Sequence, residues 1–241
     1  MRKIIIVCLS IITPIILFSQ NKNNLTIASA IKILKIHESS LEQLSPFEEG
    51  GMEKIDRLNR KVSEKLLEIL RLPEIVDFPK DSIPFFKGQS ADQNFAVFSW
   101  IENLGGSFKM AINIFYWKNA NGQPMAKEMN MEEEVAGYSN VIELKNNYEE
   151  TLYFLIGGGV SCNTCRFEKA LLLNIGKTYL EEKFSFQIDY RFNSDILGLS
   201  FDSKNQILNY EYIEDECEDE EGKNCWIRGK FRFNGITFEE M

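Results

Sequence analysis

The chain has 241 residues, and its 36 acidic against 27 basic side chains give a net charge of −9. Nucleic acids and anionic membrane surfaces bind clusters of Lys and Arg, so this balance argues against both as partners. Hydrophobic residues make up 44% of the chain, enough for a sizeable core, and the 18 Phe residues favour a β-rich one.

The first segment, residues 1–19, has the pattern of a secretory signal peptide. Arg2 and Lys3 form a positive start, an apolar run follows, and Ser19 is a small residue at the expected cleavage point. The apolar run is shorter than the ~20 residues that span a bilayer, and Pro14 interrupts it. We therefore expect cleavage after Ser19, which leaves a periplasmic or secreted protein without a transmembrane segment.

Cleavage would also change the charge and the cysteine count. Loss of two basic residues changes the net charge from −9 to −11, and loss of Cys8 leaves four of the five cysteines. These four are Cys162, Cys165, Cys217 and Cys225. An even number in an oxidising compartment favours disulfides. Three pairings are possible, and we favour the two local ones, Cys162–Cys165 and Cys217–Cys225, because each falls within one loop region.

Two amphipathic helices are expected at residues 25–45 and 52–72, since apolar residues recur there at helical spacing. Pro46 and the Gly50–Gly51 pair separate them, and Pro73 ends the second. The apolar stripes predict an antiparallel helical hairpin, or a pair laid on the following domain.

After residue 84 the hydrophobic pattern changes to a period of two, which indicates β-strands. The expected strands are 95–100, 108–117, 141–144, 151–156, 170–175, 184–190, 196–201, 207–213, 226–233 and 236–238. Turn signals such as Asn121–Gly122 separate most of them. We therefore expect a mainly β fold with an N-terminal helical hairpin (α+β), in the form of an antiparallel sandwich, an open barrel or a curled sheet. The helical pair and an extended linker would occupy 20–84, and the antiparallel β domain 85–241.

The motif from Cys162 to Cys165 has the Cys-x-x-Cys spacing of thiol–disulfide oxidoreductases. It follows Gly157–Gly159, which we interpret as a wide hairpin loop, and residues 166–175 after it have a strand pattern. The βαβ frame of such enzymes is missing. A structural disulfide is therefore preferred to redox catalysis. It is also preferred to a four-cysteine zinc site, because Cys217 and Cys225 are spaced more widely than zinc ligands usually are.

Other polar groups suggest no cofactor or metal. The acidic stretch from Glu211 to Glu221 is interpreted as a solvated hairpin tip, since its spacing matches no calcium-loop pattern, although clustered carboxylates can hold Ca²⁺. His37 is the single histidine and lies near the apolar stripe of the first helix, which favours a packing role. A multi-histidine metal site is thereby excluded.

An aromatic-rich hairpin surrounds Gly105–Gly106 and contains Trp100, Tyr116 and Trp117. These three rings are candidate ligand-binding residues, because exposed aromatic faces stack on sugars or peptides. Core packing is the more ordinary role for such residues. Adjacent strand residues point to opposite faces, so Tyr116 and Trp117 are not expected in the same core.

Several elements occur in a recognisable order. They are Ser90 and Asp92, the Ser99–Trp100 pair, the Gly105–Gly106 turn and the strand "TLYFLIGGG" from Thr151. In this order the chain resembles a group of uncharacterised secreted proteins from Bacteroidetes. The resemblance implies export and the α+β architecture, and it implies no activity. The cysteine pairs lie outside the shared pattern.

These observations predict an exported, non-catalytic cell-envelope or secreted protein that acts by binding or scaffolding, with a cell-envelope protein or a glycan as its partner. One alternative is an exported hydrolase with two carboxyl groups ~5–10 Å apart in a cleft. Another is a redox protein that uses Cys162 and Cys165. The ligand and the oligomeric state are left open.

Overall fold

The computed structural model describes residues 27–106, 110–129, 136–191, 198–218 and 224–241, without the side chains of 214–218 and 224. The expected signal peptide lies outside these residues, as does the tip of the acidic stretch. Within the described ranges, no helix has the length and apolar character needed to cross a membrane.

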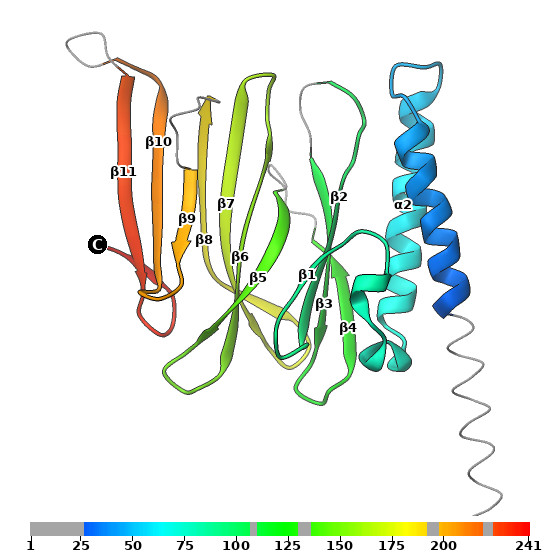
Figure 1. Cartoon of the computed structure of the whole chain (residues 1–241), viewed down its shortest axis with the longest axis horizontal. Coiled ribbons are helices and arrows are strands. Elements are labelled where there is room, and N and C mark those ends of the chain that lie inside the picture. The colour runs from blue at the N-terminus through cyan, green and yellow to red at the C-terminus, as the bar shows by residue number, and fades with distance from the viewer. Residues whose placement is uncertain (1–26, 107–109, 130–135, 192–197, 219–223) are drawn as a thin grey trace, which may run out of the picture.

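Two helices begin the described chain, as predicted. The first is helical over 27–43, and α2 runs from Gly51 to Leu70. They lie side by side and run in opposite directions (Figure 1). Pro73, three residues after the end of α2, cannot continue the helix because it has no backbone N–H to donate. Two short 3₁₀ turns follow, η1 (Pro73–Asp77) and η2 (Lys80–Ser82).

The rest of the described chain forms three antiparallel sheets of four strands each, so the predicted fold class is confirmed. Sheet A has the order β1 (Phe86–Gln89), β2 (Phe95–Ile101), β3 (Ala111–Lys118) and β4 (Pro124–Glu128). Sheet B has the order β5 (Gly137–Lys145), β6 (Thr151–Val160), β7 (Cys165–Ile175) and β8 (Leu180–Arg191). Sheet C has the order β12 (Phe238–Glu240), β11 (Asn224–Phe233), β10 (Ile207–Glu218) and β9 (Gly198–Asp202). The stacked open sheets are consistent with the sandwich or curled sheet among the predicted arrangements.

Hydrophobic cores join four layers, in the order helices, sheet A, sheet B and sheet C (Figure 1). Leu66 of α2 and Phe98 of β2 belong to the first core. Val97 of β2 belongs to the second core, which lies between sheets A and B. Phe154 and Phe238 contact each other in the third core, between sheets B and C, with ring centroids 4.9 Å apart. Sheet A is thus buried on both faces, which explains the nearly continuous apolar sequence of β2 and β3.

Neighbouring residues of β3 point to opposite faces of sheet A and pack in two different cores, as the period of a strand predicts. Tyr116 packs against the helices in the first core, whereas Trp117 packs in the second core between the sheets. The prediction that these two residues do not share a core is confirmed.

The structure corrects the interpretation of Gly157–Gly159 as a hairpin loop. All three glycines lie within β6 and pair with β7. A Cβ on Gly157 would lie 2.6 Å from the carbonyl oxygen of Gly137, and one on Gly158 would lie 2.7 Å from that of Phe167. Glycine is therefore needed here for close backbone packing, and turn geometry plays no part. The period-two hydrophobic pattern did not predict β1 and β4, because both strands are short.

The predicted bridge between Cys162 and Cys165 is present, with its two sulfurs 2.08 Å apart. Cys225 is also disulfide-bonded. The β10–β11 ladder pairs Glu218 with Asn224, and these two residues are the sequence neighbours of Cys217 and Cys225. The side chain of Cys217 lies outside the described residues, so the second pairing stays a prediction.

Candidate functional site

The three aromatic candidates lie in the interior. Trp100 is 7% exposed, Tyr116 is fully buried and Trp117 is 3% exposed. The indole N–H of Trp100 donates to Oδ1 of Asn59 on α2 at 3.0 Å, and the Asn59 amide donates to the carbonyl of Glu102 at 2.7 Å. Trp100 and Tyr116 therefore pack between the helices and sheet A, and Trp117 packs between sheets A and B. None of the three presents a face for a ligand to stack on.

A polar cleft of about 480 Å³ opens where sheets A and B meet. Its walls come from the turn before β2, the β3–β4 turn, the start of β6 and the end of β7. They are formed by Asp92, Asn94, Lys118, Asn119, Ala120, Gly122, Glu150, Thr151, Tyr153, Asn174 and Ile175. We call this the Asp92 cleft.

Asp92 organises one wall of the cleft. Its Oδ1 accepts hydrogen bonds from the Ser90 hydroxyl at 2.6 Å and from the backbone N–H of Asn94 at 2.9 Å. Its Oδ2 accepts the Tyr153 hydroxyl at 2.8 Å and the Asn94 amide at 3.1 Å. The tyrosine comes from β6, so the carboxylate ties sheet B to the turn between β1 and β2. The backbone N–H of Asp92 also donates to Glu143 on β5, at 2.7 Å.

These contacts favour the charged form of the Asp92 carboxyl group. Burial alone would raise the pKa of Asp92, but the hydrogen bonds from Ser90, Asn94 and Tyr153 outweigh it and lower that pKa below its ordinary value. Burial and the bond to Asp92 raise the pKa of the Tyr153 phenol. A general acid must hold a proton near neutral pH, which excludes Asp92 from that role.

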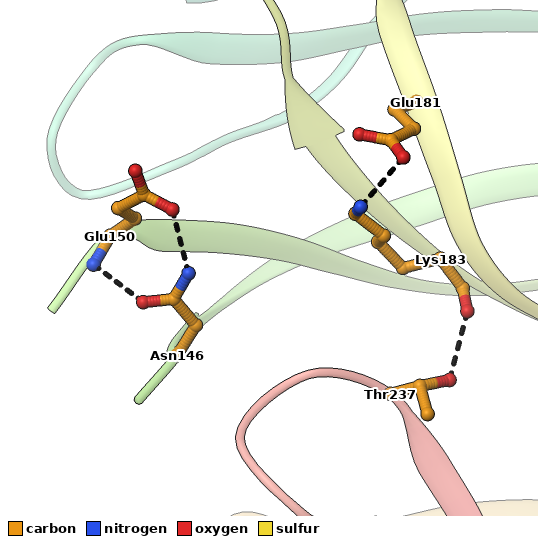
Figure 2. Close-up of polar contacts among 5 residues, drawn as sticks. All are labelled: Asn146, Glu150, Glu181, Lys183 and Thr237. Atoms are coloured by element: carbon orange, nitrogen blue, oxygen red, sulfur yellow. Dashed lines mark hydrogen bonds and ion pairs between the residues drawn. The ribbon is translucent and has the colours of Figure 1, made fainter. Parts of the chain in front are cut away.

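Two further turns of the cleft are held by asparagine side chains, which commonly close turns by bonding to their own backbone. Oδ1 of Asn119 accepts the N–H groups of Asn121 and Gln123 at 2.9 and 3.0 Å. Asn146 accepts the N–H of Glu150 and donates to Oε2 of the same residue, both at 2.8 Å (Figure 2). Asn146 thereby fixes the Glu150 carboxylate at the rim of the cleft.

On the other side of sheet B, the loop before β12 is tied to β8. The Thr237 hydroxyl donates to the carbonyl of Lys183 at 2.8 Å, and the Lys183 ammonium pairs with Glu181 at 2.6 Å (Figure 2). The backbone N–H of Asn147 donates to Gly235 at 3.1 Å, from the turn that also carries Asn146. The turns at this end of sheets B and C therefore support each other.

Some polar groups in the cleft keep hydrogen-bonding capacity. Among the described residues, the Lys118 ammonium and the Asn174 side-chain amide make no hydrogen bond, and Oε1 of Glu150 accepts none. The cleft therefore offers a cation, a carboxylate oxygen and an amide to a ligand.

A second cleft of about 560 Å³ lies between the 3₁₀ turns and β1 and is lined in part by Lys80 and Asp77. Lys80 is 3% exposed, and its ammonium donates to the carbonyls of Ile75, Val76 and Phe78. Burial lowers the pKa of Lys80 to about 8, with a further contribution from Lys118, while Asp77 opposes the shift. All three protons are used within the fold, so Lys80 anchors η1.

A third cleft of about 400 Å³ lies on sheet C and includes Glu211 and Arg228. These two side chains form an ion pair at 2.9 Å. The Arg228 guanidinium also lies 5.1 Å from the ring centroid of Trp226, which is 40% exposed. Trp226 is thus the most exposed of the three tryptophans, although the sequence pattern favoured Trp100 and Trp117 as ligand-binding residues.

Two other titratable groups lie elsewhere. Burial, followed by the charges of Asp56 and Glu128, raises the pKa of Glu102. Burial and the charge of Lys61 on α2 lower the pKa of the half-buried His37. Within the described chain, no three His, Cys, Asp or Glu side chains are arranged to hold a metal ion.

Sequence reasoning singled out Asp92 only through the resemblance, and it missed Lys118, Glu150 and Asn174. Lys118 is the last residue of β3, Glu150 precedes β6, and Asn174 lies near the end of β7. No local motif connects them. The β6–β7 pairing brings Glu150 and Asn174 to one end of sheet B, and the packing of sheet A on sheet B adds Lys118.

No family model matches the chain, and neither a curated protein nor a solved structure shows significant similarity to it. The resemblance to secreted Bacteroidetes proteins is therefore an expectation from the sequence elements alone.

Proposed function

We propose that this chain is the precursor of an exported, non-catalytic cell-envelope or secreted protein that binds a neutral, polyhydroxylated ligand of the saccharide class in the Asp92 cleft. The observation that carries the proposal is the set of polar groups left available there, on Lys118, Asn174 and Glu150. The signal-peptide pattern supports export.

The chemistry of the cleft suits hydroxyl groups. A hydroxyl both donates and accepts, and the cleft offers donors on Lys118 and Asn174 with acceptors on Asn174 and Glu150. The positive and negative charges of Lys118 and Glu150 disfavour a ligand of high net charge. The volume of about 480 Å³ lies in the range of small-molecule sites. Asp92 and Tyr153 already form a hydrogen bond with each other, so their role is to hold one wall of the cleft in place. The ligand would bind to the neighbouring groups of Lys118, Asn174 and Glu150.

The test uses residues 20–241, purified and screened against an array of neutral and acidic oligosaccharides, with hits measured by calorimetry. Lys118→Met should weaken binding of a neutral hit about tenfold, which corresponds to about 1.4 kcal/mol. Lys54→Met is the matched control, because Lys54 is exposed on α2, away from the cleft.

Equal affinity of the wild type and the Lys118→Met and Asn174→Ala variants for every hit would place the binding elsewhere and refute this site. Export is tested separately, by secreting the full chain from a Gram-negative host and sequencing its N-terminus. A mature protein that begins at Gln20 is expected, and retention of residues 1–19 would contradict the proposal.

A second candidate function is the hydrolase with paired carboxylates, and Glu102 is the observation that favours it. Its raised pKa, with Asp56 and Glu128 contributing, is a property that a general acid needs. None of the three clefts described above includes Glu102. Turnover of a glycoside or ester panel that Glu102→Gln abolishes and Glu53→Gln preserves would favour this function over simple binding.

A further inference from the structure

The tip of the β6–β7 hairpin carries an accessible disulfide. Cys162 and Cys165 are bonded across a turn in which Asn163 and Thr164 are exposed and both cysteines are partly exposed. A partner molecule can therefore approach the sulfur atoms without opening any of the three cores.

This disulfide contributes little to holding the hairpin together. The β6–β7 ladder already continues to the pair Val160 and Arg166, and Ser161 donates to the carbonyl of Cys165 at 3.3 Å. A disulfide stabilises mainly by restricting the unfolded chain, and this effect is smallest for short loops. The bridge spans a sequence separation of only 3. Its reduction should therefore leave the fold intact.

The surroundings favour a thiolate at Cys162 once the bridge opens. The backbone N–H of Cys165 points at Sγ of Cys162 at 2.9 Å, and the Thr164 hydroxyl lies 3.6 Å from the same sulfur. Hydrogen-bond donors stabilise a thiolate and make it a better leaving group.

We propose that Cys162 and Cys165 form a thiol–disulfide exchange site that accepts electrons from a protein dithiol. A partner thiolate attacks Sγ of Cys165, the Cys162–Cys165 bond breaks, and Cys162 leaves as the stabilised thiolate. The second partner thiolate attacks the partner's own sulfur in the mixed disulfide and releases the Cys165 thiolate. The partner is oxidised to a disulfide by two electrons, and its two protons are taken up by the two thiolates, directly or through solvent. This activity is independent of ligand binding in the Asp92 cleft.

The first test needs no variant. Oxidised residues 20–241 are titrated with dithiothreitol, quenched with an alkylating agent and mapped by mass spectrometry, while tryptophan fluorescence and circular dichroism report the fold. Cys162 and Cys165 should be labelled before Cys225, with the native spectra unchanged. Labelling of Cys162 and Cys165 only together with unfolding would overturn the proposal.

The second test measures exchange with a peptide that contains two reduced cysteines. The oxidised protein should convert the peptide to its disulfide about tenfold faster than an equal concentration of glutathione disulfide. Cys162→Ser should abolish this oxidation, because the remaining Cys165 thiol has no disulfide to exchange with the peptide. Ser161→Ala should keep the wild-type rate. A wild-type rate no faster than glutathione disulfide would show the bridge to be structural only. Saccharide binding by the same preparation is measured in parallel, so the two proposals fail separately.

Discussion

The hydroxyl of Tyr153 donates a hydrogen bond of 2.8 Å to Oδ2 of Asp92, which joins the middle sheet to a turn of the neighbouring sheet. Tyr153 is buried, and its ring stacks on Phe95 of β2 with centroids 5.1 Å apart. One side chain thus contributes both apolar packing and a polar contact to the same inter-sheet junction.

Replacement of Tyr153 by Phe should therefore lower the free energy of unfolding by about 1 kcal/mol. This value is below the usual range for a hydrogen bond to a charged group, because Asp92 is exposed to solvent, which screens its charge. Urea unfolding followed by tryptophan fluorescence measures it. Tyr148→Phe is the matched control, since Tyr148 is 79% exposed. Equal effects of the two substitutions would contradict the role of this hydrogen bond.

Asp92 also predicts an acid-sensitive component of stability. Its pKa is lower in the folded protein than the ordinary value of 3.8, so the unfolded chain binds the proton first as the pH falls. The stability that the ionised Asp92 carboxylate contributes is fully present above pH 3.8. It disappears as the pH falls through the lowered pKa of Asp92 in the folded protein. The loss of stability between about pH 5 and about pH 3 should be smaller in Asp92→Asn than in the wild type. Parallel profiles of unfolding free energy against pH for the two proteins would contradict this role of Asp92.

His37 predicts a separate effect at a higher pH. Burial and Lys61 lower its pKa below 6.5, so protonation favours the unfolded chain. Stability should be highest above 6.5 and should decrease as the pH falls from there to the lowered folded pKa. His37→Gln should remove this slope from melting curves collected in that window. An unchanged slope would show that His37 titrates equally in both states.

Trp100 should be much more sensitive to substitution than Trp226. Trp100→Phe deletes the donor to Asn59 and leaves that buried amide oxygen without its partner, which should cost about 2–3 kcal/mol. Trp226 is 40% exposed, and the same change there should cost less than about 1 kcal/mol. Chemical unfolding of both variants measures the difference. Similar costs would mean that the Asn59 contact does not hold α2 on sheet A.

Lys80→Met should destabilise the protein by about 2 kcal/mol, because it removes the ammonium group that donates to three carbonyls around η1. Lys87→Met is its control, since Lys87 is exposed on β1. Thermal unfolding of both variants gives the comparison. If Met at position 80 were as well tolerated as Met at position 87, Lys80 would not anchor the turn.

Much of the fold could be predicted from local patterns. The apolar stripe that includes Leu66 predicts α2, and the alternation at Tyr116 and Trp117 separates them correctly between two cores. The spacing of Cys162 and Cys165 predicts their bridge. In each case the signal lies within a few residues, where periodicity and chain geometry are sufficient.

The sequence by itself determined the mainly β class, the helical hairpin and the local disulfide, because secondary-structure period and short-range spacing are properties of neighbouring residues. Only the tertiary structure decided that Gly157 and Gly158 belong to a strand, since the requirement for glycine comes from the backbones of Gly137 and Phe167 packed against them. It also decided that the aromatic candidates are buried and that Lys118, Glu150 and Asn174 meet in one cleft. Those outcomes depend on how strands pair and how layers stack, and side chains distant in sequence jointly determine both.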